Sequence, residues 1–245
     1  MKRNLYLILI LPYTLTQFSS CKKPGCLTDA GTIVVSQRPA ASFHQIELQD
    51  NINLVLTQDT IERIRIEAGE NLQPVITTNI SNGLLTIKNA GTCSWLRSPS
   101  ETIKAYVSVK NLDRLNYNGS GQVTTTNTLL ADGITFFSDA GAGNMHIALN
   151  AKRTYAYIYG VNTDMIFSGK SDSCYIYTGQ RGTIDFRNFI VKHQKVGYGS
   201  LRDGYVHATE SLHVLQYFRG TLYYKGKPPQ VTTEYFSTGK VLPMD

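Results

Sequence analysis

The chain has 245 residues, of which 42% are hydrophobic and 17% are charged, and it contains 20 glycines and 15 tyrosines. This composition is too hydrophobic for a disordered chain and lacks the Ala, Glu, Lys and Leu excess of helical proteins, so it indicates one β-rich globular domain. The net charge of +6 comes from scattered lysines and arginines. No nucleic-acid-binding motif interleaves aromatic residues with them, which argues against a nucleic-acid partner.

The first twenty residues have the layout of a secretory signal peptide. Met1, Lys2 and Arg3 form a cationic start, residues 5–11 form a short apolar run, and Pro12 and small polar residues follow. This run is well short of the ~20 residues that span a hydrocarbon core, so we predict cleavage rather than a permanent transmembrane helix. Removal of residues 1–20 takes Lys2 and Arg3 away and lowers the net charge from +6 to +4.

The segment Phe18-Ser19-Ser20-Cys21 resembles the lipobox of bacterial lipoproteins, in which the cysteine becomes the lipid-modified first residue of the mature protein. The alternative is an ordinary signal peptide that is cut nearby and leaves Cys21 as a thiol. We predict that acyl chains on Cys21 anchor the protein to a lipid membrane. Lys22 stands where an aspartate commonly retains lipoproteins at the inner membrane, which favours the outer membrane and leaves its periplasmic and surface faces both open.

Residues 21–40 are expected to form a tether between the lipid and the folded domain, because Pro24, Gly31 and Pro39 lie among small and polar residues. Three further cysteines remain, and none is in a C-x-x-C spacing. An oxidising compartment permits one disulfide among Cys26, Cys93 and Cys174, but the sequence leaves the pairing open.

Alternation of apolar and polar residues with a period of two begins after the tether and predicts half-buried β-strands. The runs are residues 44–48, 52–56, 63–67, 84–87 and 103–109. Turn-forming residues separate them at 50–51, 69–71 and 81–83, and residues 91–100 are expected to form a loop. We therefore expect an N-terminal antiparallel or alternating-strand portion at the start of a domain that covers residues 41–245.

The chain after this portion repeats itself with a period near twenty. Aligning on a recurrent glycine gives spacings of 22, 19, 19 and 20 residues. Such a period predicts an all-β solenoid with coils of about 19–22 residues, because each coil pairs only with its neighbours. Glycine is expected at the stacked turns because it permits positive φ or a close backbone approach. The predicted turn glycines are Gly119, Gly141, Gly160, Gly179 and Gly199.

Several segments carry a family resemblance: Phe43-His44-Gln45-Ile46-Glu47-Leu48, Ile66-Glu67-Ala68-Gly69-Glu70-Asn71-Leu72, Leu115-Asn116-Tyr117-Asn118-Gly119-Ser120-Gly121 and Tyr224-Lys225-Gly226-Lys227-Pro228. Over residues 41 to 240 the chain resembles the head-GIN-domain family of putative auto-transporter adhesins, which are lipoproteins and secreted proteins of Bacteroidetes. The Gly-Ser-Gly of the family is intact once and becomes Gly141-Ala142-Gly143 in the next coil. The resemblance implies an all-β solenoid without established enzymatic activity.

Catalytic and metal sites find little support in the sequence. The five histidines have no ligand spacing, so we predict no metal site, and no cofactor motif is present. The main enzymatic alternative is a β-helix polysaccharide hydrolase or lyase, since carboxylates and basic residues on one solenoid face could supply its chemistry. Its candidate residues are Asp139, Asp164, Asp172, Asp185, Asp203, Arg181, Arg187, Arg202 and Lys195.

Tyrosines crowd into the later coils and indicate a binding face, because residues at i and i+2 of a strand point to the same side. Tyr157, Tyr177 and Tyr198 are the candidate binding residues. They could stack on the rings of a glycan or dock an envelope or host protein, and the alternative is that they fill the interior or brace the sheet. The sequence leaves the oligomeric state open, and we predict a non-catalytic, adhesin-like or structural protein of the cell envelope.

Overall fold

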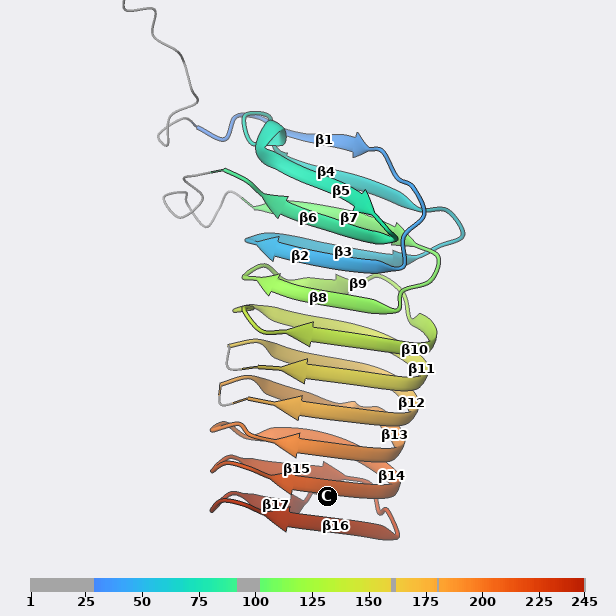
Figure 1. Cartoon of the computed structure of the whole chain (residues 1–245), viewed down its shortest axis with the longest axis vertical. Helices are drawn as coiled ribbons and strands as arrows, with labels where there is room; N and C mark the ends of the chain where they lie inside the picture. Colours follow the sequence, from blue (N-terminus) through green and yellow to red (C-terminus); the bar gives the residue numbers. More distant parts are fainter. Residues whose placement is uncertain (1–28, 92–101, 160–161, 180, 245) are drawn as a thin grey trace, which may run out of the picture.

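The computed structural model describes residues 29–91, 102–159, 162–179 and 181–244, and within them the chain forms a β-solenoid of about six turns (Figure 1). This confirms the predicted fold class. The strands are β1 (Ile33–Arg38), β2 (Gln45–Asp50), β3 (Ile52–Gln58), β4 (Arg63–Gly69), β5 (Ile76–Ser81), β6 (Leu84–Asn89), β7 (Ile103–Val109), β8 (Arg114–Gly119), β9 (Val123–Thr125), β10 (Leu129–Ser138), β11 (Asn144–Ile158), β12 (Asp164–Thr178), β13 (Thr183–Tyr198), β14 (Gly204–Gln216), β15 (Thr221–Lys225), β16 (Gln230–Tyr235) and β17 (Lys240–Pro243), with a 3₁₀ turn η1 (Gln73–Val75) before β5.

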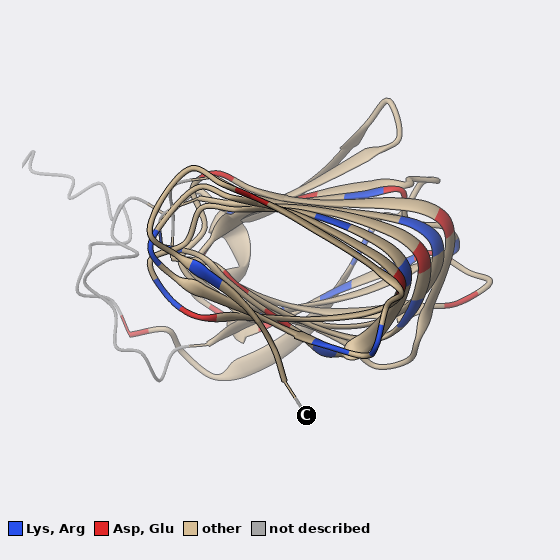
Figure 2. Ribbon diagram, turned by 90° about the horizontal axis from the view of Figure 1, so that it is seen from below, with Lys and Arg blue, Asp and Glu red and all other residues tan. Residues whose placement is uncertain are grey.

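The solenoid is flattened into two walls, which we call face A and face B (Figure 2). Face A contains β1, β4, β7, β3 and β9, then the first halves of β11 to β14, and finally β15 and β17. Face B contains β5, β6, β2 and β8, then the second halves of β10 to β14, and finally β16. Each long strand therefore crosses a corner, and its two halves belong to opposite walls.

Successive coils stack in parallel at an offset close to twenty residues. Between β11 and β12, Asn144 pairs with Asp164 and Tyr157 pairs with Tyr177. Between β12 and β13, Asp164 pairs with Thr183. Bulges in β13 shift its pairing with β12 between Ile166 and Ser168. They also shift its pairing with β14. The period therefore matches the predicted coil length but is not constant, since a bulge inserts or removes a residue locally.

The core is a narrow interior packed by every second residue of both faces. At its centre four phenylalanine rings stack across three coils, and Phe167 lies 4.7 Å from Phe136, 4.4 Å from Phe186 and 5.8 Å from Phe189 between ring centroids. All four rings are almost fully buried. Parallel stacking places like residues above one another, so the aromatic rings of adjacent coils meet at the distances that favour ring–ring contact.

The N-terminal end is closed by antiparallel strands, as expected. β1 pairs with β4, which pairs with β7, and β5 forms a hairpin with β6. Asn82 and Gly83 make this hairpin turn with φ of 50° and 75°, values that asparagine and glycine tolerate best. β1 lies within residues 21–40, which were expected to form the tether, and it pairs with β4.

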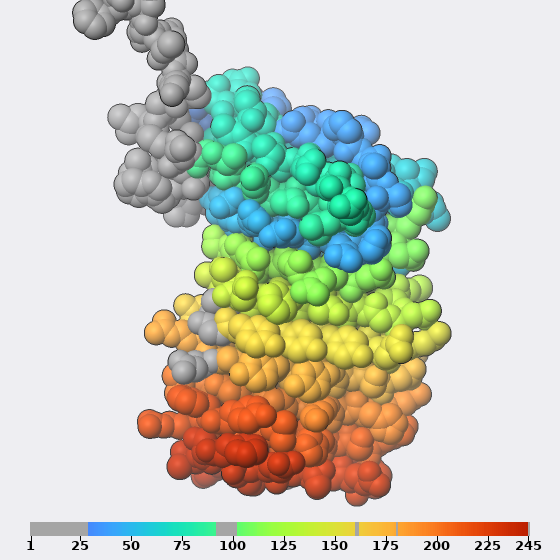
Figure 3. All heavy atoms as spheres, in the orientation of Figure 1, coloured from blue at the N-terminus to red at the C-terminus, as the bar shows by residue number. Residues whose placement is uncertain are grey.

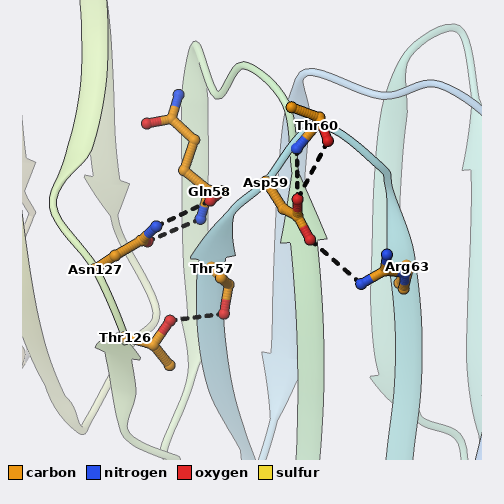
Figure 4. A network of polar contacts seen from close by, with 7 residues as sticks. All are labelled: Thr57, Gln58, Asp59, Thr60, Arg63, Thr126 and Asn127. Carbon is orange, nitrogen blue, oxygen red and sulfur yellow. Dashed lines mark hydrogen bonds and ion pairs between the residues drawn. The ribbon is translucent and has the colours of Figure 1, made fainter.

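Polar side chains hold the corner where β3 and β9 end (Figure 4). The Gln58 backbone N–H donates to Asn127 Oδ1, and Asn127 Nδ2 donates back to the Gln58 carbonyl, both over 2.9 Å. The hydroxyls of Thr57 and Thr126 lie 2.7 Å apart. The Gln58 side chain also bonds the backbone of Leu130 and Lys110, so a single residue connects three coils at this corner.

Three of the predicted turn glycines, Gly119, Gly141 and Gly199, are needed for close approach rather than for positive φ. Positive-φ glycines occur at other positions, including Gly169 and Gly226. A Cβ at Gly119 would fall well inside van der Waals contact with the Asp50 carbonyl oxygen of the adjacent coil, and a Cβ at Gly199 would meet the Thr178 carbonyl. Gly141 is crowded by Ser138, Thr163 and Tyr117, Gly179 donates its N–H to the Ile158 carbonyl, and Gly160 lies outside the described residues.

Of the cysteines, only Cys174 is described; Cys21, Cys26 and Cys93 lie outside the described residues. Cys174 is a free, fully buried thiol, and burial raises its pKa far above the usual range. A buried thiol of this kind packs as a small hydrophobic residue. No helix in the described part of the chain is long and apolar enough to cross a membrane.

Candidate functional site

A continuous row of aromatic rings crosses the outer side of face B. We call it the aromatic ladder. Adjacent members lie 5.0 to 6.4 Å apart between ring centroids. They lie in or directly after β10, β11, β12, β14 and β16, and the intervening β13 contributes no ring to the ladder. Its members are Phe137, Tyr157, Tyr159, Tyr175, Tyr177, Tyr217 and Phe236. Two of the three predicted binding tyrosines, Tyr157 and Tyr177, belong to it.

The register of the coils builds the ladder. Phe137 pairs with Tyr157, which pairs with Tyr177, so these three rings form one outward column. The same column continues at Gly197, where a Cβ would lie 3.0 Å from the Tyr177 ring and 3.3 Å from the Tyr217 ring. Because glycine leaves this space open, Tyr177 and Tyr217 approach to 6.4 Å across the intervening coil. The absence of a side chain at Gly197 keeps the ladder continuous.

The ladder is partly open to solvent. Tyr159 is 42% exposed and Phe236 is 61% exposed, while Tyr157 is half-buried among its neighbours. Burial, and then the neighbouring tyrosines, raise the pKa of the Tyr157 and Tyr175 hydroxyls, so both phenols stay protonated at neutral pH and remain hydrogen-bond donors. Figure 3 views this side of the molecule, where the coils form stacked bands. The ladder therefore offers an apolar surface with phenol hydroxyls across several bands.

Polar groups flank the rings. Arg114 lies over the Phe137 ring at 5.3 Å from its centroid, and its Nε donates to Asn116 Oδ1 over 2.7 Å. In the neighbouring outward column Tyr175 pairs with Lys195, and Lys195 pairs with His213. The rings can bind the apolar parts of a ligand, and the neighbouring hydrogen-bond donors and cations can bind its hydroxyl groups.

The prediction that Tyr198 belongs to the binding face is wrong. Tyr198 is fully buried, and its hydroxyl donates to the Arg202 carbonyl over 2.6 Å. The glycine-based alignment matched Tyr198 with Tyr159, but the coils pair Tyr198 with Thr178 and Thr178 with Ile158. A slip of one residue in a strand moves a side chain to the opposite side of the sheet, so Tyr159 points outward and Tyr198 inward.

A charge ladder at the corner between the two faces was missed by the sequence reasoning. Acidic and basic residues alternate from coil to coil there, and Figure 2 shows charged segments stacked at this corner. Lys152 pairs with Asp132 and Lys192 pairs with Asp172, each with 2.8 Å between nitrogen and oxygen. The signal in the sequence was the spacing of successive members, which is twenty residues for the first three steps and eighteen for the last. The members are Asp132, Lys152, Asp172, Lys192 and Glu210.

The charge ladder borders a groove of about 970 Å³. Its charged side chains neutralise one another: Lys192 lowers the pKa of Asp172, and Lys152 lowers the pKa of Asp132, through hydrogen bonds and charge attraction. Each of these ion pairs is more than half exposed, so it adds little to stability. These two ion pairs therefore leave little unbalanced charge among the four residues that form them.

Three of the five carboxylates named for the hydrolase alternative, Asp164, Asp172 and Asp185, form ion pairs with basic side chains. Asp164 accepts from Thr183 Oγ1 over 2.6 Å and pairs with Arg202 over 2.9 Å. Arg187 binds Asp185 and lowers the pKa of its carboxyl. A glycosidase acid requires a raised carboxyl pKa, and the shifted carboxyl groups of the described residues all move downward.

Histidines do not gather into a metal site. In the described ranges no three His, Cys, Asp or Glu side chains lie close enough together to hold a metal ion. His207 and His213 both lie on β14. His193 lies 3.2 Å from Glu210 of the charge ladder, and His213 lies 3.5 Å from Glu234 on face B.

The fold defines the class of this chain as a β-solenoid protein whose long outer walls present repeated side chains. Over residues 42–228 it matches the family model described as "Putative auto-transporter adhesin, head GIN domain", and the chain belongs to this family. The resemblance stated from the sequence is thereby confirmed. The family name supports a non-catalytic, adhesin-like role and a location at the cell surface or envelope.

Solved structures share the fold at low sequence identity. A putative adhesin from Bacteroides fragilis is 19% identical with a TM-score of 0.78, covering 87% of this chain and 97% of its own. A putative adhesin from Parabacteroides distasonis is 17% identical with a TM-score of 0.67, covering 87% and 98%. A putative lipid binding protein from the same species is 14% identical with a TM-score of 0.62, covering 88% and 98%. No curated protein matches the chain significantly.

Proposed function

We propose that this chain is an exported lipoprotein that binds glycans at the cell envelope through the aromatic ladder of face B. The observation that carries the proposal is the unbroken row of seven half-open rings, with neighbours 5.0 to 6.4 Å apart. The apolar sides of sugar rings stack on tyrosine and phenylalanine, while their hydroxyls need donors and acceptors at the margin. Arg114, Lys195 and His213 supply such groups.

An elongated ligand fits this surface better than a compact one. The rings extend along the solenoid axis over successive coils, and strands of neighbouring coils lie about 4.8 Å apart. A linear glycan that runs along the axis would meet one ring after another, and several weak contacts would add to useful affinity. An envelope or host protein is the second candidate for this face, since aromatic residues are also enriched in protein interfaces.

Removing two rings of the ladder should weaken glycan binding without unfolding the protein. We expect Tyr157→Ala with Tyr177→Ala to raise the Kd for a glycan ligand by about tenfold or more, because truncating a binding aromatic costs roughly 1 to 2 kcal/mol. The measurement is a glycan array followed by titration of the best ligand.

The matched control is Tyr205→Ala with Tyr223→Ala. These two rings stack at 5.5 Å on the outer side of face A, away from the ladder, so their loss should leave the Kd unchanged. Equal weakening by both double variants, or no glycan retained by the parent chain, contradicts the proposal. Cleavage of a polysaccharide that disappears with Asp164→Asn or Asp185→Asn would favour the hydrolase.

We further propose that Cys21 carries the lipid anchor. Its support is the apolar run and the small residues that precede it in the sequence. In cells fed a labelled fatty acid, we expect Cys21→Ala to abolish label incorporation and to release the protein from the membrane fraction, because stable anchoring requires acyl chains on this residue. The buried Cys174→Ala serves as the control and should remain labelled. Label that persists in Cys21→Ala would rule out this anchor.

A further inference from the structure

The last coil of the described residues has free strand edges. Within the described residues β16 pairs only with β14, and β17 pairs only with β15, so each has one free edge. Val231 and Tyr235 continue inward columns, since they pair with the buried Leu212 and Gln216. They are nevertheless 41% and 55% exposed. The last coil therefore exposes apolar core positions and unpaired backbone together, a combination that favours association.

The unpaired N–H and C=O groups of β16 occur at every second residue and point toward the free edge of the sheet. The Phe236 N–H donates to the Gln216 carbonyl over 2.9 Å, so the even-numbered residues of β16 bond to β14. Backbone groups alternate along a strand, and the N–H and C=O of Val231, Thr233 and Tyr235 consequently point to the open edge. These three residues are arranged symmetrically about Thr233.

We propose that two copies of the chain join end to end about a two-fold axis, with β16 of one copy antiparallel to β16 of the other, because the free N–H and C=O groups of this edge can bond to the same groups of a second copy. Centred on Thr233, this pairing places Val231 opposite the partner's Tyr235, and each of these facing residues can exchange both backbone bonds. The paired side chains lie on the inner side of the sheet and continue the apolar core. Glu234 faces the partner's Thr232, so no like charges meet.

The structure favours a second copy with this two-fold symmetry over an open stack. A two-fold contact uses the same edge of both copies and closes, whereas head-to-tail contact would use the antiparallel N-terminal end and continue into a fibre. β17 adds little to either arrangement, because the backbone of Pro243 faces the free edge and has no N–H to donate. The proposed contact therefore depends on β16, and substitutions that introduce charged side chains can test its register.

The test uses charge pairs across the proposed axis, in the chain from residue 22 onward. This part contains every described strand, and the solved relatives span a similar length. We expect sedimentation equilibrium and light scattering to show a monomer–dimer equilibrium. Val231→Lys with Tyr235→Lys opposes like charges twice per dimer and should raise the dimer Kd roughly tenfold or more. Val231→Lys with Tyr235→Glu opposes unlike charges and should retain the dimer.

Circular dichroism and thermal unfolding confirm that both double variants fold. A parent chain that stays monomeric at every concentration overturns the proposal. Equal dimer affinities for the two double variants overturn it as well, because only the antiparallel register about Thr233 brings positions 231 and 235 together. A concentration-dependent series of larger species would replace it with head-to-tail stacking.

Discussion

Replacing Phe167 by alanine is expected to lower the free energy of unfolding by about 3 to 5 kcal/mol, the range for a buried phenylalanine truncated to alanine. Phe167 of β12 is 1% exposed and contacts three other rings, two from the adjacent β13 and one from β10. Its removal leaves a cavity in the narrow interior. The surrounding strands are hydrogen-bonded to the neighbouring coils, so they cannot move far enough to fill it. Urea-induced unfolding monitored by circular dichroism measures the change.

The control for this prediction is Tyr159→Ala, which also removes an aromatic ring. Tyr159 is 42% exposed on the outer side of face B, so we expect its loss to cost less than about 1 kcal/mol. A similar destabilisation by both variants would mean that the outer rings brace the fold as much as the inner ones do. In that case the aromatic ladder would be structural rather than a binding surface.

The second large effect is expected for Gly119→Val. A Cβ at this position would overlap the Asp50 carbonyl oxygen, and that oxygen also accepts the Ser120 N–H over 2.8 Å. A backbone atom has no rotamer that relieves the clash, so β8 must move away from β2. Overpacking usually costs 1 to 3 kcal/mol, and we expect about 3 kcal/mol or more here.

Gly133→Val is the matched control for this variant. A Cβ at Gly133 would lie 3.8 Å from the Arg153 side chain, an ordinary van der Waals distance, and the residue already lies in β10. We expect its unfolding midpoint in urea to stay close to that of the parent chain. If Gly119→Val unfolds at the same midpoint as Gly133→Val, the close approach of β8 and β2 does not limit stability.

The sequence by itself determined the fold class and the size of its repeat. Alternation with a period of two located β2, β3, β4, β6 and β7, because inward positions of a half-buried strand must be apolar whatever their neighbours are. The recurrent glycines gave a coil length near twenty, since stacked coils must have nearly equal lengths. The Asn82-Gly83 turn was also readable, because its conformation is a local property of these two residues.

The tertiary structure alone decided which side of the wall each ring occupies. Tyr157 and Tyr198 are both tyrosines beside a predicted turn, yet one faces solvent and the other is fully buried. The difference depends on inter-coil register, and the bulges in β13 change that register locally. A glycine alignment that is wrong by one residue reverses the side, because side chains alternate along a strand.

The tertiary structure also decided the roles of Gly197 and of the charge ladder. Their importance comes from residues about twenty positions away, such as Tyr177 beside Gly197 and Asp172 beside Lys192. The sequence contains these spacings, but it does not state which coil contacts which or where the chain turns the corner. Pairing between coils supplies that information, because hydrogen bonds between strands fix which side chains lie next to one another.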